Sequence, residues 1–573
     1  MIVRPVFRMA LLAFALTAGV ACSDASHYAE GYEPPQDLDS PSPWASFRGP
    51  GGNAVAEDAD IPTEWSATQN LRWKVDLPGY GTSSPIVLGD KLFLTCYSGY
   101  GEGDGDGQLG NLMRHVVCVD RNSGQIVWQK QVAPVCDDER YGGFMALHGY
   151  ASNTPVTDGE NIYVFFGSSG LYGFDLEGNQ LWRADAGSGT DGWGSASSPV
   201  VYGDLVIVNA SVESGALIAF DKKSGEEAWR VDRARRSWGT PIIVEVGDRH
   251  ECILSMQDEI ISVDPATGRS LWEAAGINDY ICSSVVANDG IIYAIGARRG
   301  AAVAVQAGEV NGERELWRAD VGSNVTSPVY LNGHLYWVSD AGIAFCLDAE
   351  TGERVYRERL GNSGRVYASA VAAGDKLYVV SRENGTFVIS ASPQFELLAH
   401  NELDDDTVFN ASPAVANDQL YLRSDRALYC IGDTVPIAAK TSADDAEPSA
   451  AVAAIQNAIA ADARLSGTRN EATREQPLST AIEEYVAGLK ALDLDAAPQD
   501  FRDALATHRE AWVKIGAYLK DFSELRGEMH DVFDKVRVET NTTLAEFTRL
   551  EKALFDTWAD VEASLEKHGV QLN

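Results

Sequence analysis

One pattern recurs along the chain and constrains its fold more than any other feature. A short apolar run ends at Asp, a Gly follows four residues later, and a large aromatic residue stands four residues after the Gly. The copies are "CVDRNSGQIVW" from residue 118, "AFDKKSGEEAW" from 219, "SVDPATGRSLW" from 262, "CLDAETGERVY" from 346 and the one-residue-shorter "GFDLEGNQLW" from 173. The Asp can accept the N–H bonds that begin a turn, and Gly supplies the positive φ that the turn needs. The pattern predicts a β-hairpin that cannot bury its aromatic ring alone and therefore stacks on copies of itself.

A second landmark sets the period of these units. A small residue, usually Pro, opens the first strand of each unit, at Pro85, Pro155, Pro199, Pro241, Val285, Pro328, Ala370 and Pro413. Successive openings lie 42–44 residues apart, except the first two, which are separated by 70 residues because of insertions near 99–114 and 133–150. Eight such units of four short strands predict an all-β, eight-bladed β-propeller.

The ends of the array predict how the ring closes. The eighth unit stops at "RALYCIGD", before its last strand, and the missing strand stands at the front as "NLRWKVDLPG" with Trp73. We therefore expect a propeller over residues 44–433 that is closed by strand 71–77. Six Trp residues share this blade position, and we interpret them as packing between blades rather than as a ligand site. They are Trp73, Trp128, Trp182, Trp229, Trp272 and Trp317.

The N-terminus carries an export signal. Arg4 and Arg8 precede an apolar stretch over 9–20, and small residues then lead to Cys22. Residues 1–22 are therefore predicted to be a lipoprotein-type signal peptide with Cys22 lipidated, the alternative being ordinary cleavage near this Cys. Residues 23–43 are polar and Pro-rich, as in a flexible tether. With Ser23 after the Cys, we expect a lipid anchor at the outer membrane, facing the periplasm.

The charge of the chain narrows the choice of partners. The formal net charge is -37, and both nucleic acid and anionic lipid head groups need a basic face. We therefore expect no nucleic acid as a partner and contact with the membrane only through the lipid anchor. Protein partners in the cell envelope remain.

The sequence changes character after the propeller. Residues 434–449 are predicted to be a linker, and helical periodicity extends over 450–573. One apolar stripe runs from Phe501 to Val536 and another from Leu544 to Leu565. These stripes predict a small all-α domain, a hairpin or bundle in which two long helices follow two shorter ones.

The repeat resembles the PQQ-type (pyrroloquinoline-quinone) propeller repeat. The array over 44–433 resembles the BamB family of outer-membrane assembly factors, and also the wider set of bacterial PQQ-like repeat proteins that open with stretches like "WASFRGPGGNAV" and "IPTEWSATQNLRWKVDLPG". The resemblance implies a non-catalytic envelope scaffold that docks a protein partner, with outer-membrane protein assembly as a candidate role and no cofactor. The helical tail has no counterpart in that family.

Two other functions are compatible with this fold. Quinoprotein dehydrogenases hold PQQ over the propeller centre with an adjacent-Cys disulfide, carboxylate and amide ligands to Ca²⁺, and an Asp base. This chain has no adjacent Cys pair and no CxxC, so we expect it not to be an enzyme. Cys96 and Cys118 are expected on neighbouring strands, where they either pair or stay free. A polysaccharide- or peptide-binding propeller is the second alternative.

The loops that lead from each Trp strand to the next blade carry the candidate binding residues. Aromatic residues and Arg gather there, and both types are favoured at protein interfaces. These candidates are Tyr80, Tyr150, Trp193, Arg235, Arg236, Trp238, Tyr280, Arg365, Tyr367 and Phe409. The alternative is that the rings only fill the mouth of the central channel.

A short acidic loop is the one candidate metal site. Glu102, Asp104 and Asp106 alternate in "EGDGDG" like the start of an EF-hand calcium loop. The twelfth position, which should be Glu, is Met113. A solvated Gly/Asp loop is the plainer interpretation.

Overall fold

The computed structural model describes residues 44–102, 106–136, 138–433, 450–473, 476–492, 494, 496–526, 532–533, 535–537 and 544–568. The predicted signal peptide with Cys22, the tether, the linker and Asp104 lie outside the described residues. The chain divides into two compact units, Met1–Val435 and Pro436–Asn573.

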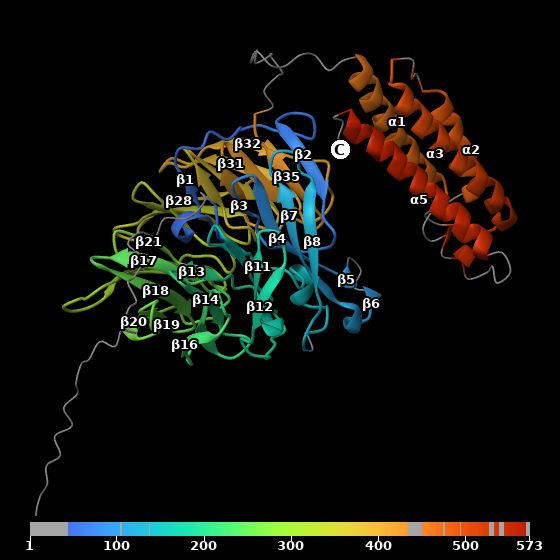
Figure 1. Cartoon of the computed structure of the whole chain (residues 1–573). Helices are drawn as coiled ribbons and strands as arrows, with labels where there is room; N and C mark the ends of the chain where they lie inside the picture. Colours follow the sequence, from blue (N-terminus) through green and yellow to red (C-terminus); the bar gives the residue numbers. More distant parts are fainter. Residues whose placement is uncertain are drawn as a thin grey trace, which may run out of the picture. The chain divides into compact units, whose positions relative to one another are not determined.

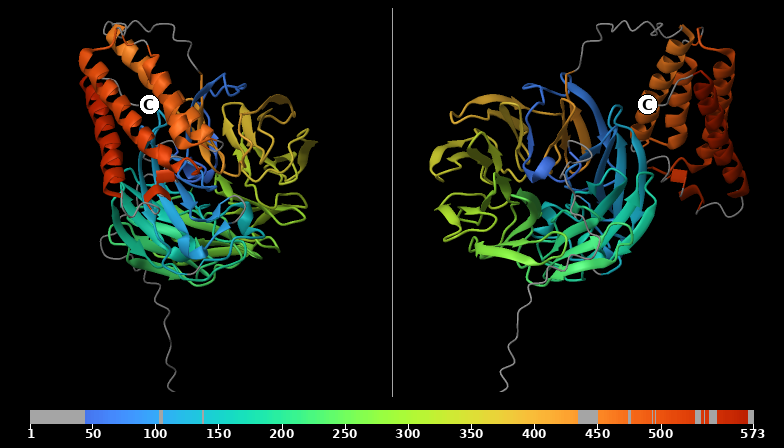
Figure 2. Two further views of the ribbon diagram at one scale, coloured as in Figure 1. Left: turned by 90° about the vertical axis from the view of Figure 1, so that its right-hand side faces the viewer. Right: turned by 60° about the vertical axis from the view of Figure 1, so that its left-hand side comes forward.

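The first unit is an eight-bladed β-propeller, which confirms the predicted fold class (Figures 1 and 2). Blades one to four are β3 (Ile86–Leu88), β4 (Lys91–Ser98), β7 (Met113–Asp120), β8 (Ile126–Val132); β9 (Val156–Thr157), β10 (Asn161–Phe165), β11 (Leu171–Asp175), β12 (Gln180–Ala184); β13 (Val200–Tyr202), β14 (Leu205–Ala210), β15 (Ala216–Asp221), β16 (Glu227–Val231); and β17 (Ile242–Val246), β18 (Arg249–Met256), β19 (Glu259–Val263), β20 (Ser270–Ala275). Blades five to eight are β21 (Val286–Asn288), β22 (Ile291–Gly296), β23 (Ala301–Gln306), β24 (Glu315–Ala319); β25 (Val329–Leu331), β26 (His334–Val338), β27 (Ile343–Asp348), β28 (Arg354–Arg359); β29 (Val371–Ala373), β30 (Lys376–Val380), β31 (Thr386–Ser390), β32 (Leu397–Asn401); and β33 (Ala414–Ala416), β34 (Gln419–Arg423), β35 (Ala427–Ile431), β2 (Leu71–Asp76).

The blade boundaries follow the spacing in the sequence. The first strand of every blade begins one residue after the small residue that opens its unit. The N-terminal strand β2 pairs antiparallel with β35, with Trp73 opposite Cys430, so the last blade is built from both ends of the array. Because blade eight contains strands from both ends of the array, the ring can open there only if β2 and β35 come apart.

The repeat pattern is explained by how neighbouring blades meet. In five blades the Trp lies on the turn Gly of the next blade, and its indole N–H donates to a carbonyl of that turn. Trp182 Nε1 donates to Lys222 O at 3.0 Å, and a Cβ built on Gly225 would lie 2.6 Å from the indole ring. The same contacts join Trp73 to Gly124, Trp128 to Gly178, Trp229 to Gly268 and Trp317 to Gly352. The predicted packing between blades is thus confirmed, and it includes the junction of blade eight with blade one.

Trp272 departs from this scheme because the turn of blade five has lost its Asp and Gly. Its indole N–H donates instead to Glu251, which is fully buried and also accepts from Ser262 Oγ at 2.9 Å. The guanidinium of Arg314 lies over the ring, 4.4 Å from its centroid. A cation and a buried carboxylate here replace the glycine turn.

The segment before the first blade, residues 44–65, crosses the face of the propeller opposite the blade openings. Trp44 O accepts from Val87 N at 2.8 Å in blade one, and β1 (Val55–Ala56) pairs parallel with β29 in blade seven. Arg48 is buried, and its guanidinium donates to Pro328 O. Burial lowers the pKa of Arg48 to about 9. The repeat pattern does not predict this belt.

The possible disulfide between Cys96 and Cys118 is not formed. Both lie on the adjacent strands β4 and β7, but Cys96 stands opposite His115 and Cys118 opposite Phe93. Both thiols are free and buried. Neighbouring strands therefore bring the two side chains into the same sheet but out of register.

The second unit is helical. Its described helices are α1 (Ala450–Ala472), α2 (Leu478–Lys490), α3 (Gln499–Tyr518) and α5 (Leu544–Lys567). Two of the sequence expectations change: α1, with 23 residues, is not short, and the helix expected across 501–536 ends at Tyr518. Leu519 and Phe533 continue in the same core, so the apolar spacing alone does not show where the helix stops. No helix in the described part of the chain is both long and apolar enough to cross a membrane.

Candidate functional site: the loop face of the propeller

The loops between one blade and the next, together with the turns between the second and third strands, form one face of the propeller, here called the loop face. Both sequence insertions lie on it. The first contains the short hairpin of β5 (Tyr100–Glu102) and β6 (Asp106–Gly107), and the second precedes blade two. The predicted binding residues all lie on this face.

The structure buries part of the predicted binding set. Arg235, Arg236 and Arg365 are exposed, and Tyr80, Trp193 and Tyr367 are half-buried. The remaining four aromatic residues are buried: Tyr150, Trp238, Tyr280 and Phe409. Fewer of the predicted residues are therefore accessible to a partner than the sequence suggested.

Trp193 is the centre of an aromatic cluster. Its ring centroid lies 4.0 Å from that of Phe144 in a parallel stack, 4.8 Å from Tyr280 and 6.1 Å from Trp238. Trp238 Nε1 donates to Gly194 O at 2.8 Å, which fixes the loop that carries Trp193. Phe144 is 50% exposed and comes from the second insertion. The repeat pattern does not predict the place of Phe144 because an insertion has no repeat position by which to place its residues.

The other predicted aromatic residues form separate contacts. Tyr80 packs on Tyr97, with centroids 6.2 Å apart, and the guanidinium of Arg426 lies over Tyr80. Tyr367 accepts a hydrogen bond from Arg365 at 2.9 Å. Tyr150 also packs on Tyr97, and Phe409 packs on Tyr429. The predicted set is thus not one continuous patch.

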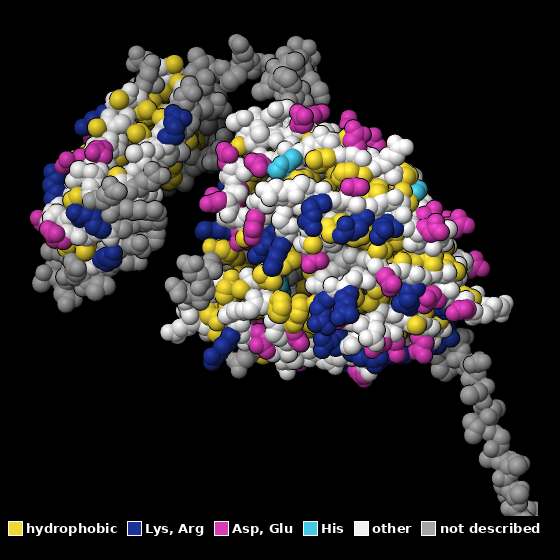
Figure 3. Space-filling model, turned by 180° about the vertical axis from the view of Figure 1, so that it is seen from behind, with side chains coloured by type: hydrophobic (Ala, Val, Ile, Leu, Met, Phe, Trp, Pro, Cys, Tyr) yellow, Lys and Arg dark blue, Asp and Glu magenta, His cyan; other side chains and the backbone are white. Residues whose placement is uncertain are grey.

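Basic side chains are grouped on parts of the propeller surface despite the acidic total charge (Figure 3). On the loop face, Arg235 forms an ion pair with Glu259 at 3.4 Å. Arg236 has a positive φ of 46°, a strained conformation for a residue with a side chain. Both side chains stay accessible to a partner.

A cavity of about 220 Å³ opens at the mouth of the central channel. Its walls include Trp193, Trp238 and Tyr367, and Phe47 from the N-terminal belt also lines it. His148 contacts Ser152 Oγ through Nδ1 at 2.5 Å and Trp193 O through Nε2 at 2.6 Å. Burial lowers the pKa of His148.

A ring of hydroxyl groups surrounds this channel and was missed from sequence. The residue before each blade opening is Ser or Thr, and from blade two to blade eight its hydroxyl oxygen accepts from the backbone N–H of the equivalent residue in the preceding blade. Seven links of 2.9–3.0 Å run through Ser84, Thr154, Ser198, Thr240, Ser284, Ser327, Ser369 and Ser412. The signal was present as a hydroxyl residue before each of the eight openings.

The channel mouth does not fit a calcium–quinone site of the kind that the dehydrogenase resemblance implies. The described residues that line the cavity include no Asp or Glu. No three His, Cys, Asp or Glu residues that could hold a metal ion gather in the described part of the chain. In the acidic loop, Glu102 accepts the Gly99 N–H, while Asp104 lies outside the described residues. The calcium-loop prediction therefore remains open.

Comparisons with known proteins agree with the interpretation of the repeat as PQQ-like. A family model described as "Outer membrane protein assembly factor BamB" matches residues 113–358, less than half of the chain. The Salmonella typhimurium protein of that name is 22% identical over 267 residues, which cover 43% of this chain. The chain spans 66% of that relative's length.

Two solved structures are also similar. BamB from Moraxella catarrhalis has a TM-score of 0.47 and 16% identity, covering 64% of this chain and 98% of that one. Quinohemoprotein alcohol dehydrogenase from Comamonas testosteroni has a TM-score of 0.47 and 12% identity, covering 72% and 84%. The repeat pattern, the eight blades and the family-model match identify the chain as a PQQ-like repeat β-propeller protein that resembles the BamB family of outer-membrane assembly factors and carries an extra helical module.

Proposed function

We propose that this chain is a non-catalytic envelope protein that docks a protein partner on its loop face, with outer-membrane protein assembly as the candidate role. The observation that carries the proposal is the stacked pair of Phe144 and Trp193. Half of Phe144 is exposed although its ring is already ordered against Trp193 at 4.0 Å. A pre-ordered aromatic ring buries apolar area on binding while losing little conformational entropy.

The surroundings of this pair suit a protein interface. Arg235 and Arg236 precede Trp238 in the same loop and are exposed. Aromatic residues and Arg supply most of the binding energy at protein interfaces. The absence of carboxylates among the described residues lining the channel mouth supports a role without quinone chemistry. The export signal and the relatives named as outer-membrane assembly factors support an envelope location.

The test is crosslinking in the native envelope. Tagged full-length protein is crosslinked, purified and analysed for named components of the outer-membrane barrel-assembly machinery. Changing Phe144→Ser together with Arg235→Ala should reduce the recovered partner about ten-fold or more, the scale of one lost hot spot. Leu316→Ser is the matched control, since Leu316 is 47% exposed on the outer strand β24. Equal recovery of the partner with the unchanged protein and with the variant that carries Phe144→Ser and Arg235→Ala contradicts docking at this site. Dye reduction that depends on PQQ and Ca²⁺ contradicts the non-catalytic role.

A polysaccharide or peptide ligand is the second candidate function. The supporting observation is the channel-mouth cavity, which has Trp193, Trp238 and Tyr367 on its walls and hydroxyl groups on its lining. Aromatic faces with nearby hydroxyls are suited to sugars and to peptide side chains. Titration of the full-length protein with cell-wall oligosaccharides, followed by tryptophan fluorescence, tests it. A saturable signal that survives Arg235→Ala, a change outside the lining of the cavity, would favour this candidate over partner docking.

A further inference from the structure

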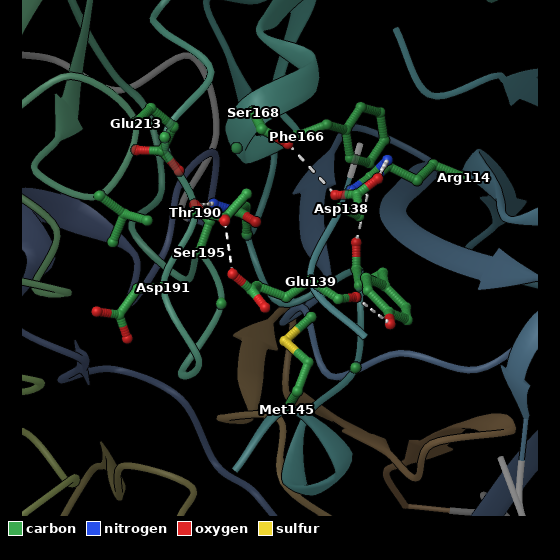
Figure 4. Close-up of a pocket in the computed structure, with 17 residues that line it drawn as sticks. Arg114, Asp138, Glu139, Met145, Phe166, Ser168, Thr190, Asp191, Ser195 and Glu213 are labelled. Carbon is green, nitrogen blue, oxygen red and sulfur yellow. Dashed lines mark hydrogen bonds and ion pairs between the residues drawn. The ribbon is translucent and has the colours of Figure 1, made fainter. Parts of the chain in front are cut away.

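A second, smaller cavity on the loop face differs chemically from the channel mouth (Figure 4). It lies between the insertion before blade two, the loop after β12 and the turn between β14 and β15, and its volume is about 30 Å³. Glu213, Glu139 and Asp191 line it together with Ser195. We call it the acidic pocket.

Glu213 is the most buried carboxylate of the acidic pocket. It is 5% exposed, and its Oε1 atom has no hydrogen-bond partner in the described part of the chain. Burial is the main cause that raises the pKa of Glu213 to about 7, and the nearby Ser195 side chain partly opposes the shift. Gly167 has a φ of 55°, and a Cβ there would lie 3.1 Å from Oε1. The glycine thus keeps open the space beside the unpaired oxygen.

The cations near this pocket are already engaged. Arg114 is the one Lys or Arg among the described lining residues, and it binds both carboxylate oxygens of Asp138 at 2.5 and 3.1 Å. On the adjoining elements, Arg183 Nε donates to Ser169 O at 2.8 Å, and Arg230 pairs with Glu227 at 2.7 Å. None of these guanidinium groups forms a hydrogen bond or ion pair with Glu213, so its charge has no protein counterpart among the described residues.

We propose that the acidic pocket receives the ammonium group of a lysine side chain from the protein partner on the loop face. The proposal rests on the docking function above for the source of that lysine. A volume of about 30 Å³ admits a group of the size of water, which a compact ammonium matches. An ammonium donates to Glu213 Oε1 while Glu139 and Asp191 add negative charge at the same pocket. Met145, Tyr150 and Phe166 also line the pocket and suit the apolar stem of lysine.

A water molecule is the competing occupant. It would satisfy the hydrogen-bonding capacity of Oε1 but leave the buried carboxylate without a counter-charge. An uncompensated buried charge is unfavourable, so the pocket should prefer a cation of the same size.

The test uses full-length protein and Nα-acetyl-L-lysine methylamide as the probe, measured by calorimetric titration at pH 8. Saturable binding is expected, and Glu213→Gln should weaken it about ten-fold or more, because the isosteric amide removes the charge that an ammonium needs. Asp320→Asn, an exposed carboxylate on the same face outside the pocket, should leave the affinity within about three-fold. Circular dichroism checks that both variants are folded.

Three results overturn the proposal. These are no binding of the lysine probe to the unchanged protein, equal binding to the Glu213→Gln variant, or equal binding of the Nε-acetylated probe, which has no charge. The first is expected if the pocket holds only water. Because the probe needs no partner, these results are independent of the crosslinking test: docking can fail while the pocket binds lysine, or succeed without it.

Discussion

At the scale of the single residue, the Gly of the repeat has two separate tasks. Gly225 adopts a φ of 74°, and its missing Cβ makes room for the Trp182 ring of the preceding blade. The Asp before it completes the turn: at Asp120 the carboxylate accepts from the Ser123 hydroxyl and from the N–H groups of Ser123 and Asn122. The hydrogen bond from the Ser123 hydroxyl is the main cause that lowers the pKa of Asp120.

These two tasks can be separated by a pair of substitutions. Gly225→Ala should destabilise the propeller by about 2–4 kcal/mol, through backbone strain and the collision with Trp182. Gly333→Ala is the matched control, since Gly333 has a φ of 77° and open space around its Cβ position. It should cost only the strain, about 1–2 kcal/mol. Thermal and urea unfolding give the comparison, and equal losses would show that the Trp contact is unimportant.

Glu213 makes stability depend on pH. Its pKa is about 7 in the folded protein and 4.5 in the reference state, so between these pH values the unfolded chain releases a proton that the folded protein keeps. The folded state therefore loses stability as pH rises from 4.5 to 7, by about 3 kcal/mol in total.

Replacing the carboxyl group of Glu213 should remove this loss of stability at higher pH. Glu213→Gln is expected to be more stable than the unchanged protein at pH 8, by up to about 3 kcal/mol, and nearly equal to it at pH 4.5. Urea unfolding at the two pH values measures the difference. Glu139→Gln, at the same pocket but half-exposed, serves as the control. A stability gain that is the same at both pH values would contradict the assignment to Glu213.

At the scale of the element, neighbouring blades are joined in two places, near their outer strands and near their inner strands. The outer strands meet through Trp and Gly, and the inner strands through the hydroxyl ring. In that ring Thr240 Oγ1 accepts from Ser198 N at 3.0 Å and its own N–H donates to Ser284 Oγ at 2.9 Å. The Thr240 hydroxyl thus satisfies a buried N–H of the preceding blade that no strand pairing reaches.

Breaking one hydrogen bond of the hydroxyl ring should lower the free energy of unfolding by about the amount that one unpaired buried N–H donor costs. Thr240→Val keeps the shape of the side chain but leaves the Ser198 N–H without its acceptor, so we expect a loss of about 1–3 kcal/mol. Thr267 is the control: it is half-buried in a surface turn and accepts only a long bond of 3.4 Å from Arg269 N, so Thr267→Val should change stability by less than about 1 kcal/mol. Thermal unfolding of both variants is the measurement. Equal midpoints would mean that solvent in the channel replaces the missing acceptor.

At the scale of the whole molecule, the two units have separate cores. The helical core gathers around Ile482, Trp512 and Phe547, and Arg469 lies between the rings of Tyr485 and Trp512 at 4.7 and 4.3 Å. The propeller closes on itself through β2 and β35, and through Trp73 on Gly124. Neither set of contacts draws residues from the other unit.

The propeller should therefore fold without the helices. A chain of residues 44–433 is expected to keep a β-sheet circular dichroism spectrum and one cooperative thermal transition. Beginning the chain at residue 78 removes the closing strand and the N-terminal belt, and should abolish that cooperative transition. If residues 44–433 aggregate or melt without cooperativity, the helical unit is needed for the propeller to fold.

The sequence by itself determined the blade number, the blade boundaries, the closing strand and the packing role of the Trp residues. Each of these depends on turn chemistry or on spacing within one repeat, and the repeat is visible as letters. The chain also contained the hydroxyl before each opening, but its role appears only when the eight blades form a ring.

The tertiary structure alone decided which loop residues face a partner. Whether Trp238 or Trp193 is buried depends on Phe144, Tyr280 and the course of loops from different blades, and these lie tens of residues apart in the chain. The same is true of the acidic pocket, since the unpaired carboxyl of Glu213 arises from an insertion and two turns that meet on one face. The burial of Glu213 and its lack of a counter-charge result from the packing of these segments, and no local sequence pattern around Glu213 encodes them.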